Sequence, residues 1–208
     1  MIDLYTFPTP NGFKVSIMLE EVKLPYQVRI VNITKDEQFK PEFLAINPNN
    51  KIPAIVDSEG PDGKPMAVFE SGAILVYLAQ KTKSPLLPTD PRGFTTVMEW
   101  LFFQMASVGP MFGQMNHFGR FAPEKIPYGI NRYTNESKRI LGVMDKQLST
   151  NAHLAGSNYS IADIACYPWV RSAETYLESI ESWANVKRWA DVLAARPAVQ
   201  KGMQIPPR

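Results

Sequence analysis

Cysteine is almost absent from this chain of 208 residues. Because Cys166 is the only one, no disulfide can form within the chain, and a redox mechanism that needs two cysteines of one chain is excluded. The lack of disulfides fits a reducing compartment, and we expect the protein to be cytoplasmic. Histidine is scarce too: His117 and His153 are far apart in the sequence, so we predict no metal site.

Long hydrophobic runs and a strong charge of either sign are also missing. No apolar run approaches the roughly 20 residues that span a membrane. The opening MIDLYTF carries Asp3 and no basic segment, so we expect no signal peptide and no membrane span. The net charge of +2 gives no reason to expect a nucleic acid or an acidic membrane as partner. With 45% hydrophobic residues, the chain can still build a sizeable core.

The first 82 residues combine strand and helix patterns. Apolar stretches that alternate or are rich in β-branched residues predict strands, and apolar residues at intervals of three and four predict helices. The order is strand, helix, strand, a short helical turn, two strands and a helix. The expected elements are a strand at 2–7, a helix at 15–22, a strand at 26–33, a helical turn at 41–46, strands at 52–57 and 66–70, and a helix at 70–81.

The later part of the chain shows helix patterns only. Residues 83–90, within the proline-rich stretch SPLLPTDPRG, predict a linker between an α/β domain at 1–82 and an all-helical domain at 91–208. The expected helices lie at 97–108, at 131–148, from 160 onward and at 186–193, where Arg196-Pro197 ends or kinks the last one.

Several residues of the helical part are expected to be structural. Ser160 lies three residues before Asp163, which is typical of a capping box that starts a helix. Cys166 follows among apolar residues, where a buried and inert thiol is expected. The core of this domain is expected to include Trp100, Leu101 and Phe102.

The order of elements and several motifs resemble the cytosolic glutathione transferases over nearly the whole chain. The motifs are NNKIPAIVD (49–57), FESGAILVYLA (69–79) and NYSIADIA (158–165). TPNG near the N-terminus and the segment 109–133 are similar to the nu class of bacteria and to its fungal nitrogen-regulator-like relatives. The resemblance implies a thioredoxin-like α/β domain followed by an all-α domain, a homodimer, and glutathione as co-substrate without a metal.

Pro53 stands at the start of a predicted strand, where a missing N–H is tolerated. By base rates only about 5% of such bonds are cis, so a trans bond is the default. The resemblance implies instead that the Ile52–Pro53 bond is cis. In this fold a cis bond turns the backbone N–H and C=O of Ile52 outward, where they pair with the cysteinyl unit of glutathione as an added strand would.

Glu70 and Ser71 precede a helix pattern. Ser71 is expected to cap that helix, which is a structural role. The same helix N-terminus also favours an anion, and the resemblance implies that Ser71 binds the γ-glutamyl carboxylate while Glu70 pairs with the ammonium group. Lys51 and Gln38 match family positions at the glycyl end of the tripeptide, although solvated surface side chains are the alternative for both.

The helical domain adds further candidates for binding. The resemblance implies that Arg132 points towards bound glutathione, whereas a solvated helix arginine is the alternative. Polar side chains interleaved with aromatic ones suggest a wall that meets both core and solvent, and the resemblance implies that they line the second-substrate pocket. A surface loop remains an alternative for His117. These candidates are Gln114, Asn116, His117 and Phe118.

The turn FPTPNG, residues 7–12, stands where the family keeps the group that activates the thiol. Glutathione reacts as its thiolate, and a free thiol has a pKa of about 8.5. The turn contains no Cys or Ser, and Tyr5 lies within the strand before it. The Thr9 hydroxyl and the Asn11 amide remain, with Asn11 slightly preferred. Both can stabilise a thiolate beside a helix N-terminus, but neither can take its proton.

This chemistry favours thiol–disulfide exchange between two bound sulfur compounds. The resemblance implies a glutathione-dependent disulfide-bond reductase that acts on small disulfides, with conjugation to electrophiles and reduction of peroxides as alternatives. A non-catalytic binding or regulatory protein is a hypothesis of another class. Two features speak against it: the first strand is expected from residue 2, with no Gln/Asn-rich extension, and every expected glutathione position holds a suitable residue.

Overall fold

A computed structural model describes residues 1–177 and 179–207, and these form two compact units. The first unit comprises residues 1–87 together with 196–208, and the second comprises residues 88–195. The sequence predicts the same kinds of domain but assigns the last residues of the chain to the helical one. Each unit is described by itself.

The first unit is built on a four-stranded sheet in the order β2-β1-β3-β4. Strand β1 runs parallel to β2 and antiparallel to β3, and β4 is antiparallel to β3. The elements of this unit are β1 (Ile2–Thr6), α1 (Pro10–Val22), β2 (Tyr26–Ile30), η1 (Ile33–Lys35), η2 (Glu37–Phe39), α2 (Pro41–Leu44), β3 (Ala54–Asp57), β4 (Met66–Phe69), α3 (Ser71–Thr82) and α9 (Pro197–Gly202).

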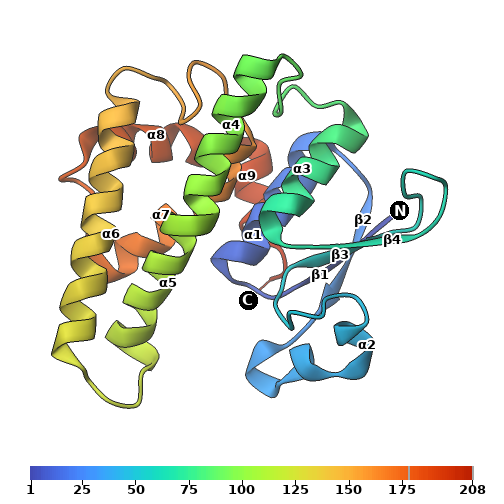
Figure 1. The fold of residues 1–208 in the computed structure, drawn as a ribbon, viewed down its shortest axis with the longest axis horizontal. Coiled ribbons are helices and arrows are strands. Elements are labelled where there is room, and N and C mark those ends of the chain that lie inside the picture. Colours follow the sequence, from blue (N-terminus) through green and yellow to red (C-terminus); the bar gives the residue numbers. More distant parts are fainter. Residues whose placement is uncertain (178, 208) are drawn as a thin grey trace. The chain divides into compact units, whose positions relative to one another are not determined.

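The side chains of β1 alternate between the two faces of the sheet, and this explains the layers that cover both faces. Ile2, Leu4 and Thr6 are buried on one face, and α1 and α3 pack against each other on that side (Figure 1). Side chains of successive residues point to opposite faces of a strand. Tyr5 therefore points to the other face, where it packs with Phe43 of α2 in a smaller apolar cluster. The expected thioredoxin-like α/β domain is thus present.

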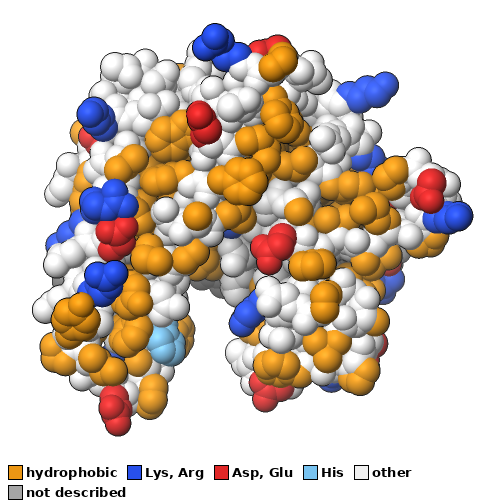
Figure 2. All heavy atoms as spheres, in the orientation of Figure 1, with side chains coloured by type: hydrophobic (Ala, Val, Ile, Leu, Met, Phe, Trp, Pro, Cys, Tyr) orange, Lys and Arg blue, Asp and Glu red, His pale blue; other side chains and the backbone are white. Residues whose placement is uncertain are grey.

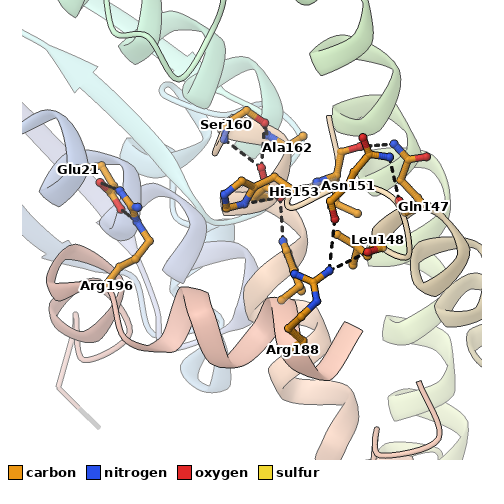
Figure 3. A network of polar contacts seen from close by, with 12 residues as sticks. Glu21, Gln147, Leu148, Asn151, His153, Ser160, Ala162, Arg188 and Arg196 are labelled. Atoms are coloured by element: carbon orange, nitrogen blue, oxygen red, sulfur yellow. Dashed lines mark hydrogen bonds and ion pairs between the residues drawn. The ribbon is translucent and has the colours of Figure 1, made fainter. Parts of the chain in front are cut away.

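The position of helix α9 corrects the predicted domain boundary. The sequence places residues 196–208 in the helical domain, but they belong to the first unit. Helix α9 packs on α1: the Ser16 hydroxyl donates to the Gly202 carbonyl at 2.7 Å. Arg196 donates two hydrogen bonds to the Glu21 carboxylate, at 2.8 and 2.9 Å, and Figure 3 shows the two side chains facing each other. Helix α8 (Ala184–Ala194) ends directly before Arg196-Pro197 as predicted, but it is not the last helix. Pro197 starts α9, because proline suits the first position of a helix.

The regular elements of the second unit are all helices among its described residues. Helix α7 packs against α4, α5 and α8, and α6 packs against α5 and α8. Two segments of π-helix, η3 and η4, flank α5. The elements are α4 (Pro91–Phe103), η3 (Gln104–Val108), α5 (Gly109–Asn116), η4 (His117–Phe121), α6 (Pro127–Leu148), α7 (Ile161–Leu177) and α8 (Ala184–Ala194).

The predicted capping box at the start of α7 is confirmed. The Asp163 carboxylate accepts a hydrogen bond from the Ser160 N–H at 2.9 Å, and the Ser160 hydroxyl accepts from the Ala162 N–H at 3.3 Å. Asp163 also accepts from the indole N–H of Trp189 at 2.8 Å. Burial raises the pKa of the Asp163 carboxyl, against the effect of these hydrogen bonds. Figure 3 shows the surroundings of this network.

The expected core of the second unit needs one correction. Leu101 is buried and Trp100 is half-buried, but 62% of Phe102 is exposed. Val97 and Leu101, four residues apart, bury one face of α4, and Phe102 lies about 100° further round the helix. Cys166 is fully buried, as predicted. Among the described residues, no helix is long and apolar enough to cross a membrane.

Candidate functional site

A pocket of about 160 Å³ lies within the first unit, where three connecting segments meet at one end of the sheet. It is formed by the turn that opens α1, by the loop that precedes β3, and by the start of α3. Its lining residues are Asn11, Asn47, Lys51, Ile52, Pro53, Glu70 and Ser71. Six of these seven are among the residues that the sequence predicts for glutathione binding or catalysis.

The turn before α1 gives Thr9 and Asn11 different positions. Thr9 is the N-cap: its hydroxyl oxygen accepts a hydrogen bond from the Gly12 N–H at 3.2 Å. Pro10 occupies the first helical position, so Asn11 follows in the first turn and lines the pocket. A Cβ atom at position 12 would collide with the carbonyl oxygen of Phe7, which explains why glycine follows Asn11. Thr9 itself is not part of the lining.

Asn47 shapes the loop before β3 and is a site residue that the sequence interpretation missed. Its side chain is 2% exposed. The amide donates to the Lys51 carbonyl at 2.6 Å and accepts from the Asn49 N–H at 2.9 Å, so it fixes the backbone on both sides of Asn50. Within NPNNK it reads as one more turn residue, and only its burial reveals this role. The Ile52–Pro53 peptide bond that follows is cis, as the resemblance predicted.

The start of α3 differs from the prediction that Ser71 caps this helix. Glu70, not Ser71, occupies the cap position, and it makes no side-chain hydrogen bond to the helix. Glu70 has a φ of 68°, a conformation that costs a non-glycine residue about 1–3 kcal/mol and is most often kept at functional sites. Ser71 is the first helical residue, and its hydroxyl accepts a hydrogen bond from Lys14 Nζ at 3.2 Å. The hydroxyl therefore faces across to α1.

Lys14 is the second residue that the sequence interpretation missed. It lies in α1 between Phe13 and Val15, and its side chain is only 1% exposed. A single cation inside an otherwise apolar helix face, GFKVSIML, is the sequence signal that could have found it.

The other predicted site residues lie outside the pocket. Gln38 is half-buried in η2, and its side-chain oxygen has no hydrogen-bond partner among the described residues. Arg132 is exposed in the second turn of α6. Both roles expected for them remain predictions.

The candidates for the second-substrate wall all lie on α5 and η4. Gln114 and His117 are exposed, and His117 belongs to a π-helical segment rather than to the alternative surface loop. Phe118 stacks on Tyr133 of α6 with ring centroids 5.2 Å apart, so part of its ring serves packing. Asn116 has a buried side-chain oxygen without a hydrogen-bond partner among the described residues.

The pocket offers groups of both charges and several hydrogen-bond donors. Lys51 supplies a cation, Glu70 an anion, and the N-terminus of α3 supplies a dipole that favours an anion. The register of the sheet begins at Ala54, so Ile52 lies outside the ladder. Such a site suits a zwitterionic peptide that has carboxylates and an ammonium group. Among the described residues, no cluster of acidic, His or Cys side chains could hold a metal ion.

Family models and related proteins point to the same protein family. The model of the glutathione S-transferase N-terminal domain matches residues 1–80, and that of the C-terminal domain matches residues 132–197. The disulfide-bond oxidoreductase YfcG of Escherichia coli is 47% identical over 204 residues, which are 98% of this chain and 94% of that protein. The disulfide-bond oxidoreductase YghU of the same organism is 41% identical and the match covers 97% of this chain and 73% of that protein.

Solved structures agree over the whole chain. A glutathione transferase of Burkholderia graminis, with two glutathione molecules per subunit, has a TM-score of 0.94 and 48% identity, covering 100% of this chain and 89% of the other. One of Pseudomonas putida, with one glutathione disulfide per subunit, has a TM-score of 0.93 and 46% identity, covering 99% and 91%. The chain belongs to the glutathione S-transferase family.

Proposed function

We propose that this protein is a glutathione-dependent disulfide-bond reductase. The observation that carries the proposal is the pocket beside the first turn of α1, which joins Lys51, Glu70 and the start of α3 to Asn11. The names of the relatives YfcG and YghU support the reaction class, and the glutathione and glutathione disulfide in the related structures support the ligand.

In this proposal each end of glutathione has its own partner. The γ-glutamyl carboxylate binds Ser71 and the N-terminus of α3, where the helix dipole favours an anion. Glu70 binds the neighbouring ammonium group, and the backbone of Ile52 pairs with the cysteinyl unit. Lys51 and Gln38 bind the glycyl end of the tripeptide.

The sulfur chemistry follows from the residues at the turn. Asn11 donates a hydrogen bond to the glutathione thiolate, and the α1 N-terminus adds a favourable dipole. This thiolate attacks one sulfur of the substrate disulfide, so that a mixed disulfide forms and the other sulfur leaves as a thiolate. A second glutathione thiolate attacks the glutathione sulfur of the mixed disulfide, which yields glutathione disulfide and the second reduced thiol. No cysteine of the chain takes part.

The alternatives are of two kinds: another reaction of the same bound thiolate, or no catalysis. Conjugation to an electrophile, or reduction of a peroxide, would also start from the bound thiolate. A non-catalytic regulator would bind glutathione without turnover or not at all. Calorimetry separates this last case, because a chain that shows no binding at millimolar glutathione favours a regulator.

Steady-state assays test the reaction class. We expect reduction of 2-hydroxyethyl disulfide by glutathione to exceed conjugation of chlorodinitrobenzene by a wide margin, because Asn11 stabilises a thiolate but takes no proton. The reverse order of the two rates would exclude the reductase as the main activity.

We further propose that the protein is a cytoplasmic homodimer of the nu class. Apolar side chains on α4 support an interface between copies, since Phe102 is 62% and Phe94 36% exposed. Figure 2 shows hydrophobic side chains over the middle of α4 on the face that it displays. The TPNG motif and the segment 109–133 support the class, and the single buried Cys166 supports a reducing compartment.

A further inference from the structure

Asn11 and Gly12 form the single Asn-Gly pair of the sequence. This pair is chemically labile in proteins, because glycine has no side chain to shield its backbone nitrogen from the amide of the preceding asparagine. Asn11 is half-buried and lines the pocket, so water reaches its side chain. The first turn of α1 therefore carries a reactive pair inside the candidate site.

The reaction open to this pair is a deamidation that consumes only water. The backbone nitrogen of Gly12 gives up its proton and bonds to Cγ of Asn11, the Cγ–Nδ2 bond breaks, and ammonia leaves with the proton. Water then opens the resulting succinimide ring at either of its carbonyl groups, which leaves aspartate or isoaspartate at position 11. Nothing is oxidised or reduced, and the side chain gains a negative charge.

Neither residue of the pair can be exchanged for a less reactive one without a cost. A Cβ atom at position 12 would collide with the Phe7 carbonyl oxygen, which is backbone and cannot move aside as a side chain would. The proposed function in turn requires the amide of Asn11 at the sulfur. Protection of the pair must therefore come from a neighbouring residue.

Thr9 holds the nitrogen that the reaction uses. The Gly12 N–H donates a hydrogen bond to the Thr9 hydroxyl oxygen at 3.2 Å, so its proton must leave this bond before the nitrogen can attack. The same bond caps α1 and keeps Asn11 helical. In a helix the nitrogen of one residue cannot approach Cγ of the residue before it closely enough to close the ring.

We propose that Asn11 is a site of spontaneous deamidation and that the Thr9 hydroxyl protects it by holding the Gly12 N–H. This protection does not depend on which ligand occupies the pocket. Only its consequence for activity rests on the proposed function: an aspartate at position 11 would place a negative charge beside the glutathione thiolate, and a like charge disfavours ionisation of the thiol. Deamidation would then inactivate the reductase.

The experiment follows the mass of the tryptic peptide 1–14 while the folded protein is stored at alkaline pH, where the backbone nitrogen loses its proton more readily. Exchange of an amide for a carboxyl group raises this mass. The variants are Thr9→Val, which keeps the shape without the hydroxyl, and Thr9→Ser, which keeps the hydroxyl. Asp90→Ala is the matched control, because Asp90 caps α4 by accepting from the Gly93 N–H at 2.8 Å.

The expected result is a faster reaction in one variant only. Thr9→Val should deamidate at Asn11 at least about fivefold faster than the unmodified protein, the usual size of the effect of losing a helix cap. Thr9→Ser and Asp90→Ala should keep the rate of the unmodified protein. The synthetic peptide 1–14, which is too short to hold a helix, should be faster than all of them. Stored Thr9→Val should lose reductase activity in step with the modified fraction.

Several results would overturn the protection by Thr9. They are equal rates for the unmodified protein and the free peptide, equal rates for the unmodified protein and Thr9→Val, and an acceleration that Thr9→Ser or Asp90→Ala shares with Thr9→Val. Deamidation that follows the expected order without loss of activity would leave the protection standing, and the role of Asn11 at the sulfur would fail instead. If Thr9→Val does not fold, Thr9→Ala replaces it with the same expected result.

Discussion

At the scale of single residues, Thr9 and Asn11 serve different purposes although only Pro10 separates them. Thr9 caps α1, so Thr9→Ala should lower the free energy of unfolding by about 1 kcal/mol. Asn11→Ala should instead lower disulfide reductase activity at least about tenfold, the size of a lost hydrogen bond to a charged group, with stability nearly unchanged. Urea unfolding and steady-state assays of both variants measure the two effects.

Each variant is the control for the other. If both keep full reductase activity, the stretch FPTPNG is only a turn, and the thiolate is stabilised elsewhere. If Thr9→Ala loses activity without losing stability, the hydroxyl of Thr9 rather than the amide of Asn11 faces the sulfur.

Asp57 at the end of β3 gives a residue-scale prediction of pH dependence. Burial raises the pKa of its carboxyl, but hydrogen bonds from Lys81, Tyr77 and the Glu59 N–H outweigh this and hold the pKa below its usual value. A lowered pKa stabilises the fold at pH values above the unfolded pKa of about 3.9, and this contribution disappears as the pH falls through the folded pKa. Asp57→Asn should therefore lower the free energy of unfolding by about 1–3 kcal/mol at pH 7.

The measurement is urea unfolding between pH 7 and pH 3. The difference in stability between the unmodified protein and Asp57→Asn should be constant near neutrality and should shrink below about pH 4. Asp62→Asn, at an exposed turn residue, is the matched control and should change stability little at any pH. A difference that grows with falling pH would contradict the assignment.

At the scale of elements, the packing of α9 on α1 depends on a glycine. A Cβ atom at position 202 would lie 2.6 Å from the backbone nitrogen and Cα of Ile17, which cannot move without shifting α1. Gly202→Ala should lower the free energy of unfolding by about 1–3 kcal/mol, as overpacking does. Thermal unfolding measures it.

Gly142→Ala in α6 is the matched control for this helix contact. Nothing lies within 4 Å of the Cβ position there, so the substitution should stabilise the protein by about 0.5–1 kcal/mol through helix propensity. If both substitutions changed the free energy of unfolding equally, close packing at Gly202 would not contribute to stability.

The ends of the elements show where sequence patterns succeed and where they stop. Apolar spacing predicts the strands and the cores of α1, α3 and α6, because an element that is buried on one face has apolar residues at regular intervals in the sequence. Helix starts are harder: Pro91 and Pro127 look like loop residues but are the first residues of α4 and α6. Asn47 could not be predicted as a site residue, because its role depends on its contact with the folded loop at Lys51, whereas Lys14 left one signal in the sequence, a cation within an apolar stretch.

At the scale of the whole molecule, the exposed Phe102 is the side chain that should decide assembly. Phe102→Asp places a charge in the proposed interface between copies, where an unpaired charge is costly to bury. Light scattering should give about twice the chain mass of 23.4 kDa for the unmodified protein and the single mass for the variant.

Val192→Asp on α8 is the control for assembly. Val192 is 53% exposed and lies on another helix, so the dimer mass should persist. An unmodified protein of 23.4 kDa in solution would contradict the proposed homodimer directly.

The return of α9 to α1 also has a consequence for the order of events during synthesis. A ribosome releases residues 1–87 first, and chains generally fold their N-terminal domain as soon as it emerges. Here the surface of α1 that meets Gly202 stays uncovered until α9 has emerged, after all of residues 88–195. The sheet unit of a nascent chain is therefore incomplete until α9 has been made, and a chain cut short before α9 would expose surface of α1 that α9 covers.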